Sequence, residues 1–167
     1  MKSLENVSNN HRKEDLKLLF YGILVGIAAG GLSSFYRYII HGIEGIIGGI
    51  VNISRSHFYI YPIIFIALVF ISFLVTKIKK MSRFCGGSGI PQVEAEIKGY
   101  INPNPVKVLL AKIFGGALTA LAGFSVGREG PSIQIGAMSG KLVSRKLKKN
   151  KTVEKFLITC GASAGLA

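Results

Sequence analysis

The sequence predicts an all-α integral membrane protein: a multi-helix bundle with broken helices that cross only part of the membrane. Two long apolar runs contain no charged residue, and basic residues gather in short clusters beside apolar runs. Two glycine-rich segments that end in proline also lead into helix-compatible sequence. Together these three features predict membrane insertion.

The composition argues against an ordinary soluble protein. The chain has 167 residues, with 21 Lys and Arg against 8 Asp and Glu, and a formal net charge of +13. Only 17% of its residues are charged, whereas soluble domains average about 25%. Because the charge is confined to clusters between uncharged stretches, it indicates membrane topology.

The first 17 residues are polar and predict a cytoplasmic N-terminal arm or a short surface helix. Their basic residues are Lys2, Arg12, Lys13 and Lys17. Residues 18–167 are expected to form the membrane part of the chain.

Two runs, residues 18–36 and residues 58–76, each contain 19 residues without a charge. A helix rises about 1.5 Å per residue, so each run extends about 28 Å and matches the hydrocarbon core of a bilayer. The first run is too long for a secretory signal. Residues 38–57 are apolar but include Glu44 and Arg55, and we expect them to prolong the first helix and then form the outer connection.

Two basic clusters follow apolar sequence. Residues 77–83 come after the second span, and residues 141–155 hold seven Lys or Arg against the single Glu154. Two crossings return the chain to its starting side, so the positive-inside rule places both clusters in the cytoplasm. Nucleic-acid binding is the alternative explanation for such clusters. Their position beside apolar spans favours topology, and we expect no nucleic-acid partner.

Two stripes of small residues recur at four-residue spacing. They are Gly22, Gly26 and Gly30 in the first span, and Gly115, Thr119 and Gly123 within residues 108–126. Such stripes allow helix backbones to approach closely, which predicts a compact bundle. Residues 100–105 contain Asn-Pro-Asn-Pro and predict a break between helices.

Two segments predict helix starts. Gly-Gly-Ser-Gly-Ile-Pro at residues 86–91 precedes a helix expected over 92–98, and Gly-Arg-Glu-Gly-Pro at residues 127–131 precedes one over 132–147. Proline is favoured at the first helical position, where its missing N–H had no partner. A single glycine tract usually marks only a flexible turn, but two proline-led starts in one membrane sequence carry more weight together.

A helix that starts inside a membrane protein leaves its first N–H groups unpaired, with the positive end of its dipole facing outward. Irregular backbone at that depth requires burial in protein or a watery cavity. An anion in that cavity would satisfy both requirements. Ser88 adds a neutral hydroxyl donor, which binds an anion without the strong hold that would prevent conduction.

Glu129 is the residue least suited to apolar surroundings. A carboxylate in a membrane costs about 3 kcal/mol or more unless it is paired or protonated, yet this one stands just before a helix start. When ionised it could occupy the anion site, and when protonated it could swing away. A local ion pair with Arg128 is the structural alternative. Glu94 and Glu96 are expected to pack or hydrogen-bond rather than to carry protons.

The remaining residue types predict no metal, no cofactor and no enzymatic activity. Cys85 and Cys160 lie far apart and are expected to be small buried thiols. His11, His41 and His57 lack the spacing of a metal site. An intramembrane hydrolase with Ser88 as nucleophile would need a nearby base, and no histidine follows His57.

The sequence resembles the CLC family of chloride channels and proton-coupled chloride transporters. The resemblance covers about residues 18–167. Its motifs are Gly-Ser-Gly-Ile-Pro at 87–91, Lys-Ile-Phe-Gly-Gly at 112–116, Gly-Arg-Glu-Gly-Pro at 127–131 with Ser-Ile-Gln-Ile-Gly at 132–136, and the segment 161–167.

The resemblance implies roles for individual residues. Ser88 matches the central anion-coordinating serine, and Glu129 matches the external gating glutamate, which relays the proton in transporting members. The anion-binding set also includes Gly87, Gly89 and Ile90 around Ser88, and Gly130, Pro131, Ser132 and Ile133 as an outer site of backbone N–H groups. Pro91, Gly127 and Arg128 complete the motifs.

The resemblance also implies partners and location. We expect chloride transport by a multi-pass protein of the cell membrane, gated by Glu129, with chloride and, in transporting members, protons as the ions moved. The lipid bilayer surrounds such a protein, and the complete protein is expected to be a homodimer. Channel and antiporter both stay open, and family resemblance favours the antiporter.

The chain is short for this family, whose membrane domain is built from two inverted halves. The later Gly-x-Phe-x-Pro segment, the tyrosine of the central site and the internal proton-accepting glutamate are absent from this sequence. We therefore expect the N-terminal portion of a CLC-type fold from a longer protein. A non-transporting membrane or assembly subunit is the alternative function.

Overall fold

The computed structural model describes the backbone of residues 2–56, 58–124 and 127–167, and the side chains of residues 16–54, 59–124 and 127–167. All regular elements within these residues are helices, which confirms the predicted fold class. The elements are α1 (Lys2–Ser56), η1 (Phe58–Ile60), α2 (Tyr61–Met81), η2 (Arg83–Cys85), α3 (Ile90–Lys98), α4 (Pro105–Leu121), α5 (Glu129–Lys146) and α6 (Lys151–Leu166).

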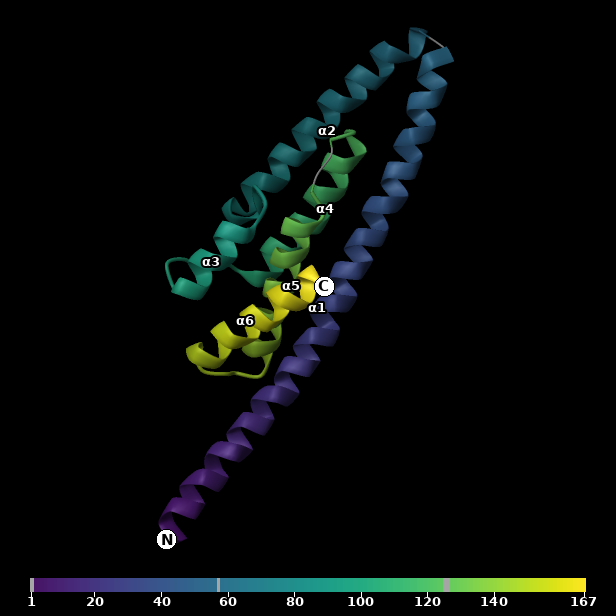
Figure 1. Ribbon diagram of the computed structural model, residues 1–167. Helices are drawn as coiled ribbons and strands as arrows, with labels where there is room; N and C mark the ends of the chain where they lie inside the picture. The colour runs from purple at the N-terminus through teal and green to yellow at the C-terminus, as the bar shows by residue number, and fades with distance from the viewer. Residues whose placement is uncertain (1, 57, 125–126) are drawn as a thin grey trace.

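The two longest helices, α1 and α2, form a hairpin with α4 between them (Figure 1). Leu16–Ser54 of α1, with 39 residues, and Tyr61–Met81, with 21 residues, are long and apolar enough to cross a membrane. No residue of α2 between Tyr61 and Met81 is buried. This hairpin therefore has the length and the exposed apolar surface of a pair of lipid-facing spans.

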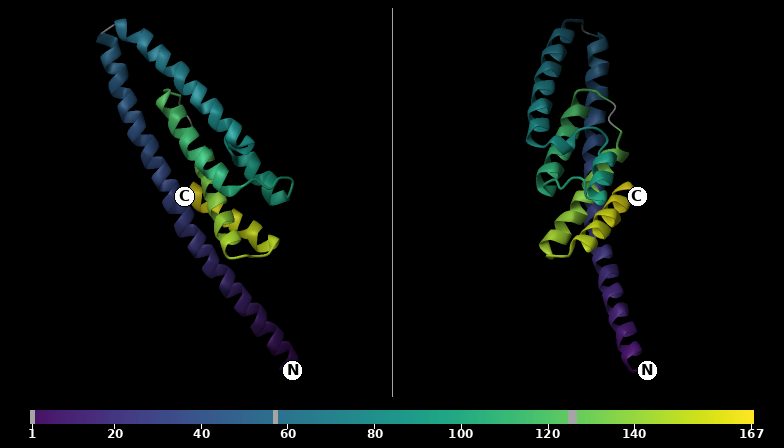
Figure 2. Two further views of the ribbon diagram at one scale, coloured as in Figure 1. Left: turned by 180° about the vertical axis from the view of Figure 1, so that it is seen from behind. Right: turned by 90° about the vertical axis from the view of Figure 1, so that its left-hand side faces the viewer.

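Helix α1 is longer than the predicted first span, because it continues without interruption from Lys2 to Ser56. No proline occurs before Pro62, and the glycines of this stretch are tolerated within a helix. Residues 2–17 are therefore a continuous extension of the span, and in Figure 2 their end projects beyond the other helices. Their cytoplasmic location stays a prediction. Residue 57 lies outside the described residues.

The closest helix contact joins α5 and α6. A β-carbon built on any of four glycines would overlap the backbone of the opposite helix, and these are Gly136, Gly140, Gly161 and Gly165. They recur at four-residue spacing on both helices, a pattern that the two predicted stripes did not include. Because each glycine lacks a β-carbon, the two backbones are in direct contact.

The predicted stripes also lie at helix contacts, but at ordinary distances. A β-carbon built on Gly22 would lie 3.9 Å from Sγ of Cys160, and one on Gly30 would lie 3.9 Å from the carbonyl oxygen of Ala164 on α6. One on Gly115 would lie 3.6 Å from Cγ2 of Ile78 on α2. Gly22 and Gly30 therefore face α6, and Gly115 faces α2. A β-carbon built on Gly26 or Gly123 would meet no described atom within 4 Å, and Gly123 lies beyond the end of α4. Residues 125 and 126, at the end of the second run, lie outside the described residues.

The predicted break at residues 100–105 is confirmed. Gly99 ends α3 with φ +90°, a left-handed conformation that favours glycine. Asn104 caps α4, and its Oδ1 accepts hydrogen bonds from the amides of Val106 and Lys107 at 3.1 and 3.5 Å. Pro105 is then the first residue of α4, where a missing N–H costs nothing.

Helix α5 lies at the centre of the bundle and contributes to two apolar clusters. One contains Val93, Val108, Ala137, Met138 and Ile158. The other contains Tyr36, Ile40, Ala120 and Ile135. Helix α5 supplies residues to both clusters, so it packs with α3 and α6 in the first and with α1 in the second, while α4 contributes Val108 to the first and Ala120 to the second.

A buried ion pair also ties α5 to α3. Lys141, whose side chain is 0% exposed, pairs with Glu96, which is 4% exposed. Nζ of Lys141 also donates to the carbonyl oxygen of Pro103 at 2.8 Å. Glu96 thus has the structural role expected for it. Glu94 instead forms an exposed pair with Lys98 at 2.6 Å.

Arg37 of α1 closes the end of α6. Its Nη2 atom donates to the carbonyl oxygens of Gly165 and Leu166 at 3.1 and 2.8 Å. These carbonyls have no partner within their own helix, and a cation there also complements the negative end of the helix dipole. The contact keeps α6 in place against α1.

Candidate functional site

Glycine allows the backbone turn that leads into α3. Gly87 has φ +69° and Gly89 has φ +94°, conformations that L side chains rarely adopt. Gly89 is the N-cap of α3, and Pro91 lies in the first turn. The helix therefore begins at Ile90, two residues before the predicted start at residue 92.

Helix α5 also begins earlier than predicted. Its first residue is Glu129, with Arg128 as N-cap, whereas the sequence predicted a start at residue 132. Pro131 falls in the first turn, where no backbone N–H has an intrahelical acceptor, so its ring does not interrupt the helix. The carboxylate of Glu129 thus belongs to the helix start itself.

The two helix starts meet in space. A β-carbon built on Gly130 would lie 2.6 Å from the carbonyl oxygen and 2.9 Å from Cβ of Ser88. One built on Gly89 would lie 2.6 Å from Oε1 of Gln134. The first turns of α5 are therefore packed directly against Ser88 and Gly89, and glycine is needed at both positions because a side chain would not fit.

Four consecutive carbonyl groups, of residues 84–87, each accept a hydrogen bond from a side chain of α3, α4 or α5. Nε2 of Gln134 donates to Phe84 O (2.7 Å), Nζ of Lys112 donates to Cys85 O (3.2 Å) and Gly87 O (2.7 Å), and Nε2 of Gln92 donates to Gly86 O (3.1 Å). The carbonyl and the N–H of a trans peptide point in opposite directions. The four hydrogen bonds therefore turn the N–H groups of the same peptides, those of residues 85–88, away from the donating side chains. Among the described residues, the amides of residues 86–89 have no hydrogen-bond partner.

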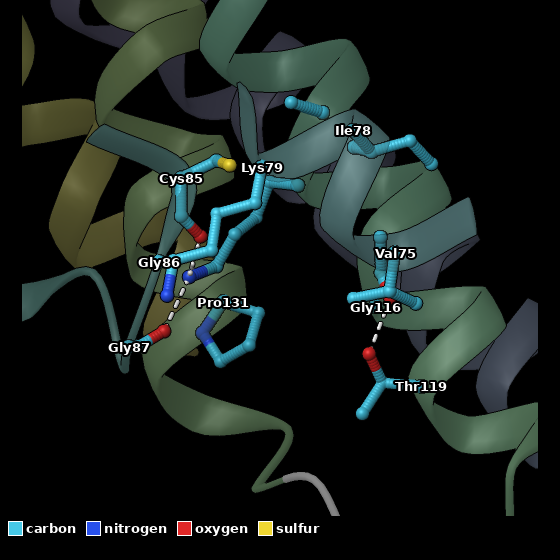
Figure 3. Close-up of a pocket in the computed structure, with 12 residues that line it drawn as sticks. Val75, Ile78, Lys79, Cys85, Gly86, Gly87, Gly116, Thr119 and Pro131 are labelled. Carbon is cyan, nitrogen blue, oxygen red and sulfur yellow. Dashed lines mark hydrogen bonds between the residues drawn. The ribbon is translucent and has the colours of Figure 1, made fainter. Parts of the chain in front are cut away.

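A cavity of about 260 Å³ lies beside this loop, between α2 and α4. Gly86, Gly87 and Lys112 line it together with Pro131 of α5. Figure 3 shows Gly87 and Pro131 facing the same space. Ser88 and Glu129 are not among its lining residues, and both side chains are exposed.

The segment 130–133 offers fewer free amides than the sequence predicts. Pro131 has no N–H, and the amide of Ser132 donates to the carbonyl oxygen of Arg128 at 3.2 Å. Ile133 lies far enough into α5 for its amide to be bonded within the helix.

The hydroxyl of Ser132 is also occupied and buried. It donates to the Arg128 carbonyl at 2.7 Å and accepts from Nε of Arg37 at 3.4 Å. Ser132 therefore connects α1 to the start of α5. Ile90, in contrast, is exposed at the start of α3.

Arg128 forms its ion pair with Glu44 of α1. The alternative of a local pair between Arg128 and Glu129 is therefore not what the structure contains. Within the described residues, Glu129 has no ion-pair or hydrogen-bond partner. Its carboxylate at the first position of α5 is left to interact with the helix dipole and with solvent.

Of the two cysteines, Cys85 lies at this site and lines its cavity, whereas Cys160 lies on α6. Cys85 and Cys160 are free thiols and are half-buried rather than fully buried. The part of the chain whose side chains are described contains no group of three or more His, Cys, Asp or Glu that could hold a metal ion. The side chains of His11 and His57 lie outside that part.

Comparison with known proteins identifies the fold. Residues 67–167 match the family described as voltage gated chloride channel. The chain belongs to this CLC family. It is similar over 90% of its length to a slow cyanobacterial Cl−/H+ antiporter of known crystal structure, with a TM-score of 0.81 and 28% sequence identity, and it covers 36% of that chain.

Curated relatives of this CLC chain include the H+/Cl− exchange transporters ClcA of Salmonella schwarzengrund (strain CVM19633) and Salmonella agona (strain SL483). Each is 29% identical over 158 residues, which is 93% of this chain and 33% of the relative. The CLC chain thus spans about a third of the length of these relatives.

The residues that orient the loop before α3 are not apparent from the sequence motifs. Lys112 belongs to the Lys-Ile-Phe-Gly-Gly motif and Gln134 to the segment after Pro131, and neither motif indicates a contact with this loop. A lone lysine inside the apolar run 108–126 was the available signal, because a buried ammonium group needs several acceptors. The structure supplies them as the carbonyls of Cys85 and Gly87.

Proposed function

We propose that this chain contributes the first part of the anion pathway of a CLC-type protein that moves chloride across the cell membrane in a multi-pass, homodimeric assembly. The observation that supports this most is the packing of Gly130 against Ser88, which joins the two glycine-led helix starts. Both starts combine unpaired amides with the positive end of a helix dipole, and this arrangement favours an anion.

Ser88 and the amides of residues 86–89 are proposed to coordinate chloride. The amides lack partners among the described residues, and the exposed Ser88 hydroxyl can add one neutral donor. Neutral donors hold the ion without fixing it in place, which transport requires.

Glu129 is proposed to gate this site. As the first residue of α5, its ionised carboxylate can take the place of chloride at the helix start, and protonation removes that attraction. The relatives named as exchange transporters favour a proton-coupled antiporter over a channel. The anion would then move when Glu129 is protonated.

Chloride flux from proteoliposomes tests the proposal. The full-length product of the gene, reconstituted in vesicles loaded with potassium chloride, is expected to release chloride when valinomycin lets internal potassium leave for charge balance, and to carry protons into the vesicles. Vesicles without protein provide the baseline. A well-folded protein that releases no chloride above this baseline would contradict the proposal and favour the non-transporting subunit.

Replacing Ser88 by alanine should weaken chloride binding about three- to tenfold, because one neutral hydrogen bond contributes about 0.5–1.5 kcal/mol and the amides remain. Isothermal titration of chloride to the purified protein measures this change. Ser34→Ala, which removes an exposed hydroxyl of α1, is the matched control. Unchanged chloride affinity in Ser88→Ala would show that the hydroxyl has only a structural role.

Replacing Gly130 by alanine should lower chloride flux by about tenfold or more, because the new β-carbon would lie 2.6 Å from the Ser88 carbonyl and would push the two helix starts apart. The control is Gly127→Ala in the same motif, where no atom lies within 4 Å among the described residues. Equal flux in the two variants, measured at equal protein incorporation, would argue against a shared site.

A further inference from the structure

A second cavity, of about 330 Å³, lies where α1 passes the connection between α5 and α6. It is far from the anion site and opens beside the beginning of the apolar span of α1. Its lining residues are Lys17, Leu18, Tyr21, Lys148, Lys149, Asn150 and Val153. Three of these are lysines and none is acidic, so the cavity carries a concentrated positive charge.

One of the three lysines is held in position by an aromatic residue. Nζ of Lys149 donates to the hydroxyl of Tyr21 at 2.9 Å and lies 4.2 Å from the centre of its ring. A cation above an aromatic face is attracted by the ring. Since an ammonium group has three donors, Lys149 keeps donors free for a ligand while its position is fixed.

The surroundings combine this positive cavity with an apolar surface. Lys17 is the second residue of the candidate span Leu16–Ser54. The exposed side chains of α1 that follow are apolar and include Leu19, Phe20, Ile23 and Ile27, which are 62%, 64%, 63% and 73% exposed. A basic cavity at the edge of such a face is complementary to an anionic phospholipid. The charged headgroup of the lipid fits the cavity, and its acyl chains can lie along the apolar side chains of α1.

We propose that this cavity binds the phosphate of an anionic phospholipid headgroup. Lys17, Lys148 and Lys149 surround the phosphate, the side-chain amide of Asn150 is available to the glycerol oxygens, and Leu18 and Val153 contact the apolar part. Tyr21 lies at the boundary between water and hydrocarbon, where tyrosine is commonly found in membrane proteins. A bound lipid would then fix α1 to the α5–α6 connection.

Native mass spectrometry of the full-length gene product in detergent tests this site. Phosphatidylglycerol and phosphatidylcholine are added in equal amounts, and bound lipids are counted. The triple variant Lys17→Gln/Lys148→Gln/Lys149→Gln should bind phosphatidylglycerol about tenfold or more weakly, since each basic residue near an anionic lipid contributes strongly. The control Lys77→Gln/Lys80→Gln/Lys107→Gln removes the same charge from exposed lysines outside the cavity and should bind as the parent does.

Two further experiments distinguish a lipid phosphate from free inorganic phosphate and control for misfolding of the triple variant. Lys17→Gln alone changes an exposed side chain and should already weaken phosphatidylglycerol binding severalfold. Millimolar inorganic phosphate should not displace the lipid. The proposal is overturned if both triple variants lose lipid equally, if phosphatidylcholine binds as well as phosphatidylglycerol, or if inorganic phosphate alone occupies the site.

Discussion

Glu129→Gln in the full-length gene product should abolish proton coupling and the pH dependence of chloride movement, while chloride still crosses the membrane. The amide cannot ionise, so it neither competes with chloride at the start of α5 nor carries a proton. The expected ratio of protons to chloride therefore falls to zero. Parallel recordings of external pH and chloride from proteoliposomes measure the ratio directly.

The matched control for this substitution is Glu94→Gln. Glu94 is an exposed carboxylate on α3 that pairs with Lys98 at 2.6 Å, and it does not stand at a helix start. This variant should keep the parent ratio of protons to chloride. A Glu129→Gln protein that still exchanged protons for chloride at the parent ratio would remove Glu129 from the mechanism.

Lys141→Met should cause the largest loss of stability. The substitution leaves Glu96 buried without its partner, and breaking a buried ion pair in this way costs about 3–5 kcal/mol. The unfolding temperature, followed by circular dichroism in detergent, should fall by about 10 °C. The double variant Lys141→Met/Glu96→Leu removes both charges and should recover most of the loss.

The exposed pair of the same helix provides the comparison. Lys98→Met breaks the ion pair between Lys98 and Glu94. The two side chains are 56% and 62% exposed, and an ion pair this open to solvent contributes little to stability. Its unfolding temperature should be almost that of the parent. If Lys141→Met were equally harmless, Glu96 and Lys141 would not be the connection that holds α3 to α5.

The parts of the fold that depend on local sequence were predictable. Uncharged apolar runs indicated the spans, and the Asn-Pro-Asn-Pro sequence within residues 100–105 indicated a break between helices that the structure contains. The extension of the first helix into residues 38–56 was predicted, but its continuation through residues 2–17 was not, because those residues are polar. Proline, which ends helices most reliably, is absent before Pro62.

Contacts between distant segments were much harder to predict. The glycines that bring α5 and α6 together have a clear spacing, but nothing local shows that Gly136 faces Gly161. The pairing of Arg128 with Glu44 likewise joins residues 84 positions apart, and Glu129 next to Arg128 was the more obvious local candidate. Such pairings depend on helix packing, which a single sequence does not encode in any short segment.

In the candidate site, too, local features were predictable from the sequence and contacts between distant segments were not. The motifs indicated two helix starts, and the packing of Gly130 on Ser88 brings them together. Their environment was not predictable, since the loop is oriented by side chains from α3, α4 and α5, and the Ser132 hydroxyl is bound to Arg128 and Arg37. Local sequence therefore predicts which residues turn the chain, and packing decides which of their polar groups stay free.

Anomalous diffraction from bromide-soaked crystals of the full-length gene product tests the central claim most directly. Bromide replaces chloride and can be located without assumptions about the surrounding protein. We predict a bromide peak within hydrogen-bond distance of the Ser88 hydroxyl or of the amides of residues 86–89, on the side facing the start of α5. Bromide peaks found only elsewhere, with that position empty, would contradict the claim that the two helix starts hold a common anion.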